Sequence, residues 1–172
     1  MSERVYLALG SNIDPHIHII RALEMLRSKY RTVRISPIFR TPAEGFIGDF
    51  FLNLVVQFDT RMTLSKTLKV LREFERRGGR RRETEIKGQV GARTLDLDLL
   101  MFGDLFGFHD GIQLPRPEIT ERRFVWQPLA ELMIDMTALN PVEDSIQKQV
   151  LKLWEDRAEP PRGFERTYIP GI

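Results

Sequence analysis

The order of its apolar segments most constrains what this 172-residue chain can fold into. Short runs rich in β-branched and aromatic residues, typical of strands, alternate with stretches whose apolar residues recur every three or four positions, typical of helices. The order is strand, helix, strand, strand, helix, strand, over residues 5–9, 15–30, 33–38, 50–58, 64–77 and 94–102. An α+β protein with a ferredoxin-like, split βαβ core has this order. We expect a four-stranded antiparallel sheet with both helices on one face, which leaves the other face to later segments or to ligand.

The rest of the chain is expected to extend this core. Turn residues and apolar periodicity predict a hairpin over 103–117, a short helix over 129–133 and a second helix over 144–157. The last residues are rich in proline and show no periodicity. We therefore predict one domain over 1–158 and an irregular tail over 159–172.

The composition excludes several classes of protein. Hydrophobic residues make up 42% and charged residues 29%, which is typical of a globular chain and not of a disordered or fibrous one. The absence of cysteine excludes disulfides, thiolate nucleophiles and cysteine-ligated metal sites. The sequence contains neither an apolar run long enough for a membrane helix nor a recognisable signal peptide. We expect a cytoplasmic protein that contacts no membrane, and a net charge of +2 does not predict binding to nucleic acid.

Two aspartates form the sharpest motif, in Arg93-Thr94-Leu95-Asp96-Leu97-Asp98. Side chains alternate along a strand, so Asp96 and Asp98 share one face, about 7 Å apart at a rise of about 3.3 Å per residue. A solvated strand face that happens to carry two acids is one interpretation. However, like charges on one face are unfavourable without a cation, and Mg²⁺ prefers one or two carboxylates together with substrate phosphates. The motif therefore favours a site for a metal–nucleotide complex.

A basic stretch precedes the aspartates. Between residues 72 and 93, eight basic side chains stand against four acidic ones, a local net charge of +4. A solvated loop and an RNA-contacting patch are the alternatives to a phosphate site. Because arginine binds phosphate oxygens through two parallel hydrogen bonds, and phosphoryl transfer needs both a metal site and such cations, the pairing favours phosphate. We expect residues 78–93 to form a mobile loop that closes over ATP.

Six blocks carry a family resemblance and occur in order between about residues 5 and 133. They are Gly10-Ser11-Asn12, Arg40-Thr41-Pro42, Phe51-Leu52-Asn53, Glu75 with Gly79-Arg80-Arg81-Arg82, residues 91–98, and Glu121-Arg122-Arg123-Phe124 with Pro128-Leu129-Ala130-Glu131. In these blocks the chain resembles the hydroxymethyldihydropterin pyrophosphokinases of folate biosynthesis. The resemblance implies transfer of pyrophosphate from ATP to the hydroxymethyl group of 6-hydroxymethyl-7,8-dihydropterin, with release of AMP. We expect a monomer.

The resemblance also implies roles for matching residues. Asp96 and Asp98 would hold two Mg²⁺ ions together with ATP. The other implied residues are catalytic Arg80, Arg82 and Arg93, nucleotide-binding Glu75, Arg93, Arg116 and Arg122, and pterin-binding Thr41, Pro42, Phe51, Asn53 and Phe124. Two aromatic rings suit a flat heterocycle and an amide suits its polar edge, although core packing is the alternative for both phenylalanines.

The sequence departs from the family pattern at two places. Arg116 stands where the family has a histidine, so a cation replaces an imidazole. Val90-Gly91-Ala92 stands where the family has an aromatic residue and a proline, in a stretch that is a few residues longer. These departures motivate the alternative of a diverged member with a changed or lost acceptor.

A binding module is the competing class, namely a ferredoxin-like domain that presents aromatic residues to RNA. The strand over 50–58 lacks the basic, glycine-containing aromatic pattern of such domains, and two aspartates repel phosphate without metal. His16 and His18 do not indicate a metal site, because residues two apart on a helix point in nearly opposite directions.

Overall fold

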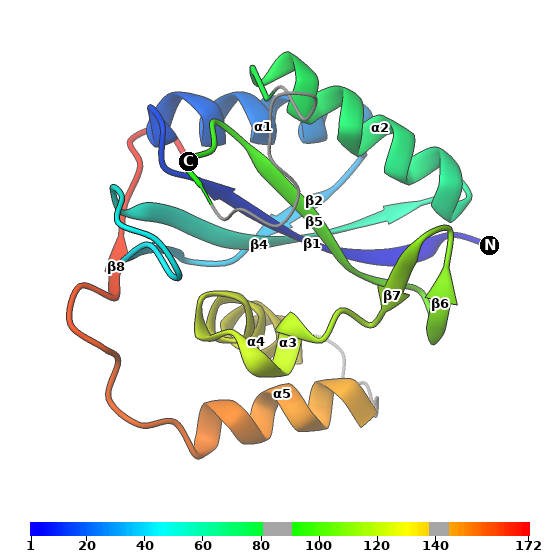
Figure 1. Cartoon of the computed structure of the whole chain (residues 1–172). Helices are drawn as coiled ribbons and strands as arrows, with labels where there is room; N and C mark the ends of the chain where they lie inside the picture. Colours follow the sequence, from blue (N-terminus) through cyan, green and yellow to red (C-terminus); the bar gives the residue numbers. More distant parts are fainter. Residues whose placement is uncertain (81–90, 138–144) are drawn as a thin grey trace.

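The computed structural model describes residues 1–80, 91–137 and 145–172. Its elements, in chain order, are β1 (Glu3–Ser11), α1 (Pro15–Lys29), β2 (Val33–Ile35), β3 (Ile38–Thr41), β4 (Phe51–Thr60), α2 (Leu64–Arg77), β5 (Asp96–Phe102), β6 (Gly107–His109), β7 (Ile112–Leu114), α3 (Glu118–Glu121), α4 (Arg123–Thr137), α5 (Ser145–Glu155) and β8 (Glu165–Thr167). Helices α1 and α2 cover one face of the central sheet, α3 and α4 lie on the other, and α5 packs outside α4 (Figure 1). The predicted α+β architecture is thereby confirmed in its general form, a mixed fold with an antiparallel sheet and helices.

The central sheet differs from the expected four strands. Among the described residues it has six, in the order β5-β1-β4-β3-β8, with β2 also paired to β4, and each of these pairings is antiparallel. One predicted strand is divided into β2 and β3 at Ser36-Pro37, because proline has no N–H to donate to a sheet. The Ser36 hydroxyl accepts a hydrogen bond from the backbone N–H of Val55 at 2.9 Å. The residues between β2 and β3 therefore stay hydrogen-bonded to β4.

Helices α1 and α2 both begin and end close to where the sequence predicts. Thr63 caps α2, since its side chain accepts a hydrogen bond from the Lys66 N–H, and the helix ends before Gly78-Gly79. Helix α1 begins at Pro15 as expected. Asp14, however, has φ 43° and makes no side-chain capping bond. Proline at the first turn is therefore the clearer start signal for α1.

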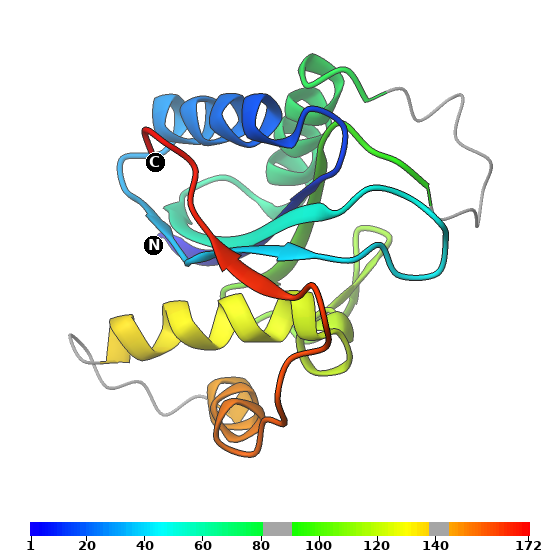
Figure 2. The same cartoon turned by 90° about the vertical axis from the view of Figure 1, so that its left-hand side faces the viewer.

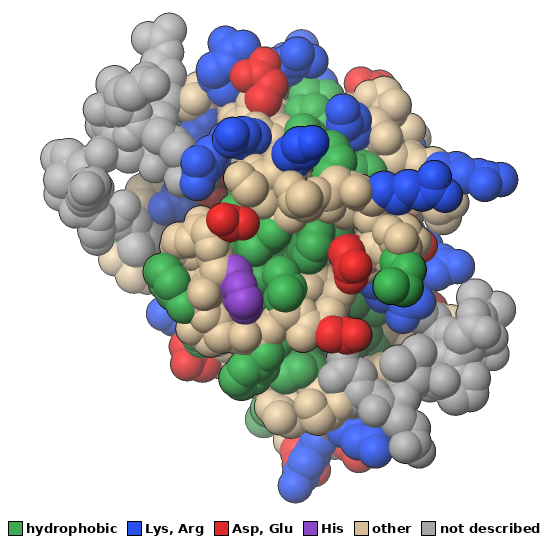
Figure 3. All heavy atoms as spheres, turned by 90° about the vertical axis from the view of Figure 1, so that its right-hand side faces the viewer, with side chains coloured by type: hydrophobic (Ala, Val, Ile, Leu, Met, Phe, Trp, Pro, Cys, Tyr) green, Lys and Arg blue, Asp and Glu red, His purple; other side chains and the backbone are tan. Residues whose placement is uncertain are grey.

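Apolar side chains fill both sides of the sheet. Leu7, Leu54 and Leu97 belong to the cluster under α1 and α2, whereas Val55 and Leu100 belong to a second cluster under α4. This two-sided burial explains why the central strands are almost continuously apolar. On the side of the molecule drawn in Figure 3, Lys and Arg side chains gather at the upper end, where the α1/α2 layer lies, with a few acidic side chains among them.

The C-terminal third is more regular than expected. The predicted hairpin is β6–β7, but α4 is longer than the predicted 129–133, with Pro128 inside it. Helix α5 matches the predicted second helix, although residue 144 lies outside the described residues. None of the described helices is long and apolar enough to cross a membrane.

The tail over 159–172 is not irregular throughout, which corrects the sequence prediction. Strand β8 pairs with β3 at the edge of the sheet (Figure 2), and Ile169 is 1% exposed in the core under α1 and α2. The strand is only three residues long, and such a short segment carries almost no periodicity.

Candidate active site

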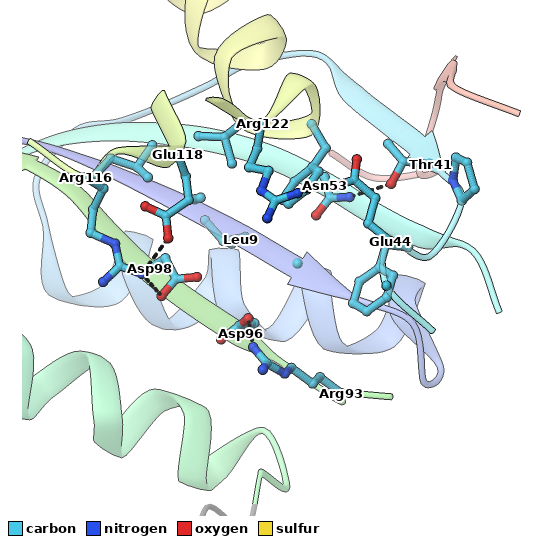
Figure 4. A pocket seen from close by; sticks show the side chains of 18 of the residues that line it. Leu9, Thr41, Glu44, Asn53, Arg93, Asp96, Asp98, Arg116, Glu118 and Arg122 are labelled. Carbon is cyan, nitrogen blue, oxygen red and sulfur yellow. Dashed lines mark hydrogen bonds and ion pairs between the residues drawn. The ribbon is translucent and has the colours of Figure 1, made fainter. Parts of the chain in front are cut away.

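A cleft of about 530 Å³ lies on the sheet face that α1 and α2 leave uncovered. Its walls come from β5, β1 and β4, from the loop after β3, and from the segment that leads through α3 into α4 (Figure 4). Segments far apart in the sequence therefore meet in one site.

A row of three residues across the sheet forms the floor. Gly10 of β1 pairs with Asn53 of β4 on one side and with Asp96 of β5 on the other. Two strand spacings therefore separate the amide from the carboxylate, about 10 Å. A side chain on Gly10 would fill the space between them, since a Cβ there would lie 3.0 Å from Asn53 Oδ1 and 4.0 Å from Asp96 Cβ. Glycine at this position keeps the floor of the cleft open.

Asp96 and Asp98 both line the cleft, as their spacing on a strand predicts. The leucines between and beside them, Leu95, Leu97 and Leu99, are buried in the opposite cluster. Desolvation and the nearby charge of Asp96 raise the pKa of Asp98 to about 6. The two carboxylates thus form a site whose negative charge is unfavourable without a cation.

The described residues include no group of three or more His, Asp or Glu side chains that could hold a metal ion. An ion at Asp96 and Asp98 would therefore take further ligands from substrate or water. Mg²⁺ suits such a site, because it is commonly bound by one or two carboxylates plus phosphate oxygens and retains several waters. The donor set fits a metal that arrives with a nucleotide.

Arg80 is buried behind the carboxylates. Its Nη1 lies 2.5 Å from Glu75 Oε1 and also contacts Asp96, and its side chain is 4% exposed. The same Glu75 oxygen accepts a hydrogen bond from the Leu97 N–H at 3.0 Å. Glu75 and Arg80 therefore attach the end of α2 to the start of β5.

The turn after β1 holds the start of β5 from the other side. Asn12 Oδ1 accepts a hydrogen bond from the Arg93 N–H at 2.6 Å, and Ser11 donates to the Thr94 carbonyl oxygen at 2.6 Å. The Arg93 guanidinium pairs with Asp96. The Gly-Ser-Asn block thus positions an arginine beside a carboxylate.

Arg116 approaches Asp98 from the segment before α3. Its Nη2 lies 3.5 Å from Asp98 Oδ1 and 3.1 Å from Glu118 Oε1 (Figure 4). The side chain at this departure from the family pattern therefore bridges two carboxylates at the β5 end of the cleft.

The other end of the cleft carries an amide and aromatic rings. Asn53 Nδ2 donates to Thr41 Oγ1 at 2.8 Å, which fixes the orientation of the amide. Phe51 meets Phe46 edge-on, with ring centroids 6.2 Å apart. Pro42 and Phe124 complete this lining. A flat, partly polar ring suits such walls.

A family model described as 7,8-dihydro-6-hydroxymethylpterin-pyrophosphokinase (HPPK) matches residues 6–134. The chain belongs to this family. An enzyme named 2-amino-4-hydroxy-6-hydroxymethyldihydropteridine pyrophosphokinase from Methylorubrum extorquens is 34% identical over 168 residues, which cover 95% of this chain and 98% of the relative. An enzyme of the same name from Bacillus subtilis is 29% identical over 164 residues, 92% of this chain and 94% of the relative.

A solved structure shows the HPPK fold at greater sequence distance. The crystal structure of Plasmodium falciparum HPPK-DHPS with SDX-DHP superposes with a TM-score of 0.61 at 14% identity. The match covers 97% of this chain and 47% of the other. The two chains therefore share their fold.

Most of the residues predicted from the sequence meet in this cleft. Those that line it are Thr41, Pro42, Phe51, Asn53, Arg80, Arg93, Asp96, Asp98, Arg116, Arg122 and Phe124. Glu75 is not among the lining residues, because its side chain is buried against Arg80 and the backbone of β5. Arg82 and Val90 lie outside the described residues.

The basic stretch before the aspartates is divided by the structure. Arg76 and Arg77 pair with Glu73 on the exposed surface of α2, and Arg72 is exposed there too. Of the described arginines in that stretch, only Arg80 and Arg93 line the cleft. The charge count along the sequence therefore included basic side chains that do not face the phosphate site, because α2 turns Arg72, Arg76 and Arg77 outward.

Sequence reasoning missed several lining residues. Glu44 and Phe46 come from a loop that showed only proline and glycine punctuation, and Glu118 lies just after the predicted hairpin over 103–117, where no element was predicted. Arg122 pairs with Glu44 at 3.2 Å across the cleft. A loop residue gives no periodic signal, so only its three-dimensional position reveals that it faces the site.

Proposed function

We propose that this cleft joins the two substrates of the family reaction and that its residues divide into a nucleotide end and an acceptor end. The protein transfers the pyrophosphoryl group of ATP to 6-hydroxymethyl-7,8-dihydropterin in folate biosynthesis, the activity of the family and of its named relatives. The hydroxymethyl oxygen forms a bond to the β-phosphorus, the bond from that phosphorus to the bridging oxygen of AMP breaks, and the hydroxyl proton is lost.

The nucleotide end is centred on β5. Asp96 and Asp98 are proposed to hold two Mg²⁺ ions, whose positive charge, when they are bound with ATP, offsets the negative charge of the phosphates. Arg93 and Arg116 lie beside these carboxylates and are suited to bind phosphate oxygens. Arg122, whose guanidinium faces the cleft opposite β5, is proposed to bind phosphate as well (Figure 4).

Arg80, Arg82 and Glu75 have the remaining proposed roles at the nucleotide end. Arg80 and Arg82 are assigned to stabilise charge on the transferred group. The burial of Arg80 against Glu75 and Asp96 supports a more specific role, in which it fixes Asp96 in place. For Glu75, the same contacts favour positioning of Arg80 and β5 over direct binding of the nucleotide.

The acceptor end is centred on Asn53. Its amide offers donors and an acceptor to the pterin edge, and Thr41 holds that amide in place. Pro42, Phe51 and Phe124 are proposed to enclose the pterin ring. That the enzyme acts as a monomer stays a prediction.

The row Asn53–Gly10–Asp96 is the observation that supports this assignment most, because the Asn53 amide and the Asp96 carboxylate lie on either side of an open floor. The amide is the proposed ligand of the acceptor, and the carboxylate is the proposed ligand of the metal. Catalysis then depends on positioning and electrostatics without a covalent enzyme intermediate. The test is AMP formation from ATP, with the pterin alcohol and Mg²⁺ each omitted in turn. We expect AMP only when all three are present; equal AMP formation without the pterin would contradict the assigned acceptor.

A further inference from the structure

The C-terminal segment 158–169 lies beyond residues 6–134, the part that the family model matches, yet it binds one wall of the acceptor end. The Arg123 guanidinium donates hydrogen bonds to the carbonyl oxygens of Ala158 at 2.8 Å and Glu159 at 3.2 Å. Arg123 stands between Arg122 and Phe124, which both line the cleft. The start of α4 is thus tied to the C-terminal segment.

The segment then joins the edge of the sheet. Strand β8 pairs with β3, the strand that leads into the acceptor end (Figure 2). The buried ring of Phe164 packs on Phe39 of β3, with centroids 5.4 Å apart, and the Arg123 guanidinium lies 5.5 Å from the Phe164 ring. One aromatic side chain of the segment therefore connects β3 to α4.

The segment also approaches the loop 42–50, at Gly163. A Cβ on Gly163 would lie 2.9 Å from the Phe50 ring and 3.9 Å from Pro42. Its φ of +84° also favours glycine. The Phe50 ring is held from another direction by the Arg40 guanidinium, 3.5 Å from its centroid. The loop that supplies Pro42 to the cleft thus rests on the C-terminal segment.

We propose that segment 158–169 is a positioning element for the pterin end of the cleft. It sets the loop 42–50 through the contact of Gly163 with Phe50, and the start of α4 through Arg123, without touching the pterin itself. This inference rests on the proposed assignment of Thr41, Pro42, Phe51, Asn53 and Phe124 to the acceptor. It follows that a change at the contact of Gly163 with Phe50 alters pterin binding and leaves ATP binding almost unchanged.

The test compares Gly163→Ala with Phe50→Leu and with the double variant. Gly163→Ala pushes the Phe50 ring and is expected to raise the KM for the pterin about threefold or more, with the KM for ATP within about twofold. Phe50→Leu loosens the same contact from the loop side and is expected to raise the pterin KM as well. In the Phe50→Leu background the effect of Gly163→Ala should shrink, because the ring it displaces is gone.

A matched control separates positioning from loss of stability. Arg166, on the same segment, pairs with Glu131 of α4 away from the cleft, so Arg166→Gln should lower Tm without raising the pterin KM. If Gly163→Ala changes neither KM, changes both KM values alike, or adds independently to Phe50→Leu, the proposal is wrong. If Gly163→Ala does not fold, Phe50→Leu decides alone, and an unchanged pterin KM overturns the proposal.

Asn53→Ala distinguishes failure of the acceptor assignment from failure of the positioning role. A raised pterin KM in Asn53→Ala with an unchanged one in Gly163→Ala would overturn the positioning role alone. An unchanged pterin KM in Asn53→Ala would overturn the acceptor assignment, and the inference that rests on it.

Discussion

At the scale of single residues, the site depends on two carboxylates whose negative charges lie unfavourably close together. Asp96 and Asp98 share one face of β5, and the pKa of Asp98 is raised to about 6 by its surroundings. Arg93, Arg80 and Arg116 each pair with one of these carboxylates. The arginines partly offset a charge that a metal–nucleotide complex would offset more fully.

Asp98→Asn tests the carboxylate pair with little change of shape. The variant keeps the volume and removes one negative charge, so AMP formation should fall at least about 10²-fold. Its Tm should stay within about 2 °C of the parent, since Asp98 is half-buried and outside the apolar core. Asp104→Asn, at an exposed residue outside the cleft lining, is the matched control and should keep full activity. Substantial turnover by Asp98→Asn at saturating Mg²⁺ would refute the metal assignment.

At the scale of elements, the residue that follows α1 packs a polar side chain against the sheet. The Tyr30 ring, just after α1, stacks on Phe58 of β4 with centroids 3.9 Å apart. Its buried hydroxyl has no hydrogen-bond partner among the described residues. Burial raises the pKa of Tyr30 to about 12.

Tyr30→Phe should therefore stabilise the protein. It keeps the stacked ring and removes an unsatisfied hydroxyl, which is worth about 1 kcal/mol in the free energy of unfolding. Because the folded-state pKa of Tyr30 lies above the unfolded one, the parent should lose stability as pH rises from about 10 towards 12, and Tyr30→Phe should lose less. Urea unfolding at pH 7 and at alkaline pH measures both. A less stable variant at pH 7 would mean that the hydroxyl has a partner, such as an ordered water.

At the scale of the whole molecule, the net charge is +2, while four of the described arginines line the cleft, namely Arg80, Arg93, Arg116 and Arg122. Exposed arginines elsewhere, such as Arg76 and Arg77, are paired on the surface of α2. The attraction of the cleft for the phosphates of ATP should be screened by salt where the lining arginines meet solvent.

Salt should therefore affect the KM values for the two substrates differently. Raising the ionic strength from about 0.05 M to about 0.5 M shortens the screening length severalfold, so the KM for ATP should rise. The KM for the uncharged pterin should change little. Steady-state kinetics with each substrate varied in turn, at fixed free Mg²⁺, checks this. Equal rises in both KM values would argue against a cationic nucleotide end.

The sequence alone determined the features that depend on local geometry. Alternation along a strand put Asp96 and Asp98 on one face, and the Gly78-Gly79 pair ended α2, because backbone conformation sets both within a few residues. The tertiary structure alone decided which distant residues meet. The register that sets Gly10 between Asn53 and Asp96, the burial of Arg80 against Glu75, and the pairing of β8 with β3 all depend on contacts between segments far apart in the chain. No local periodicity encodes such contacts, since they form only when the sheet and its covering helices pack together.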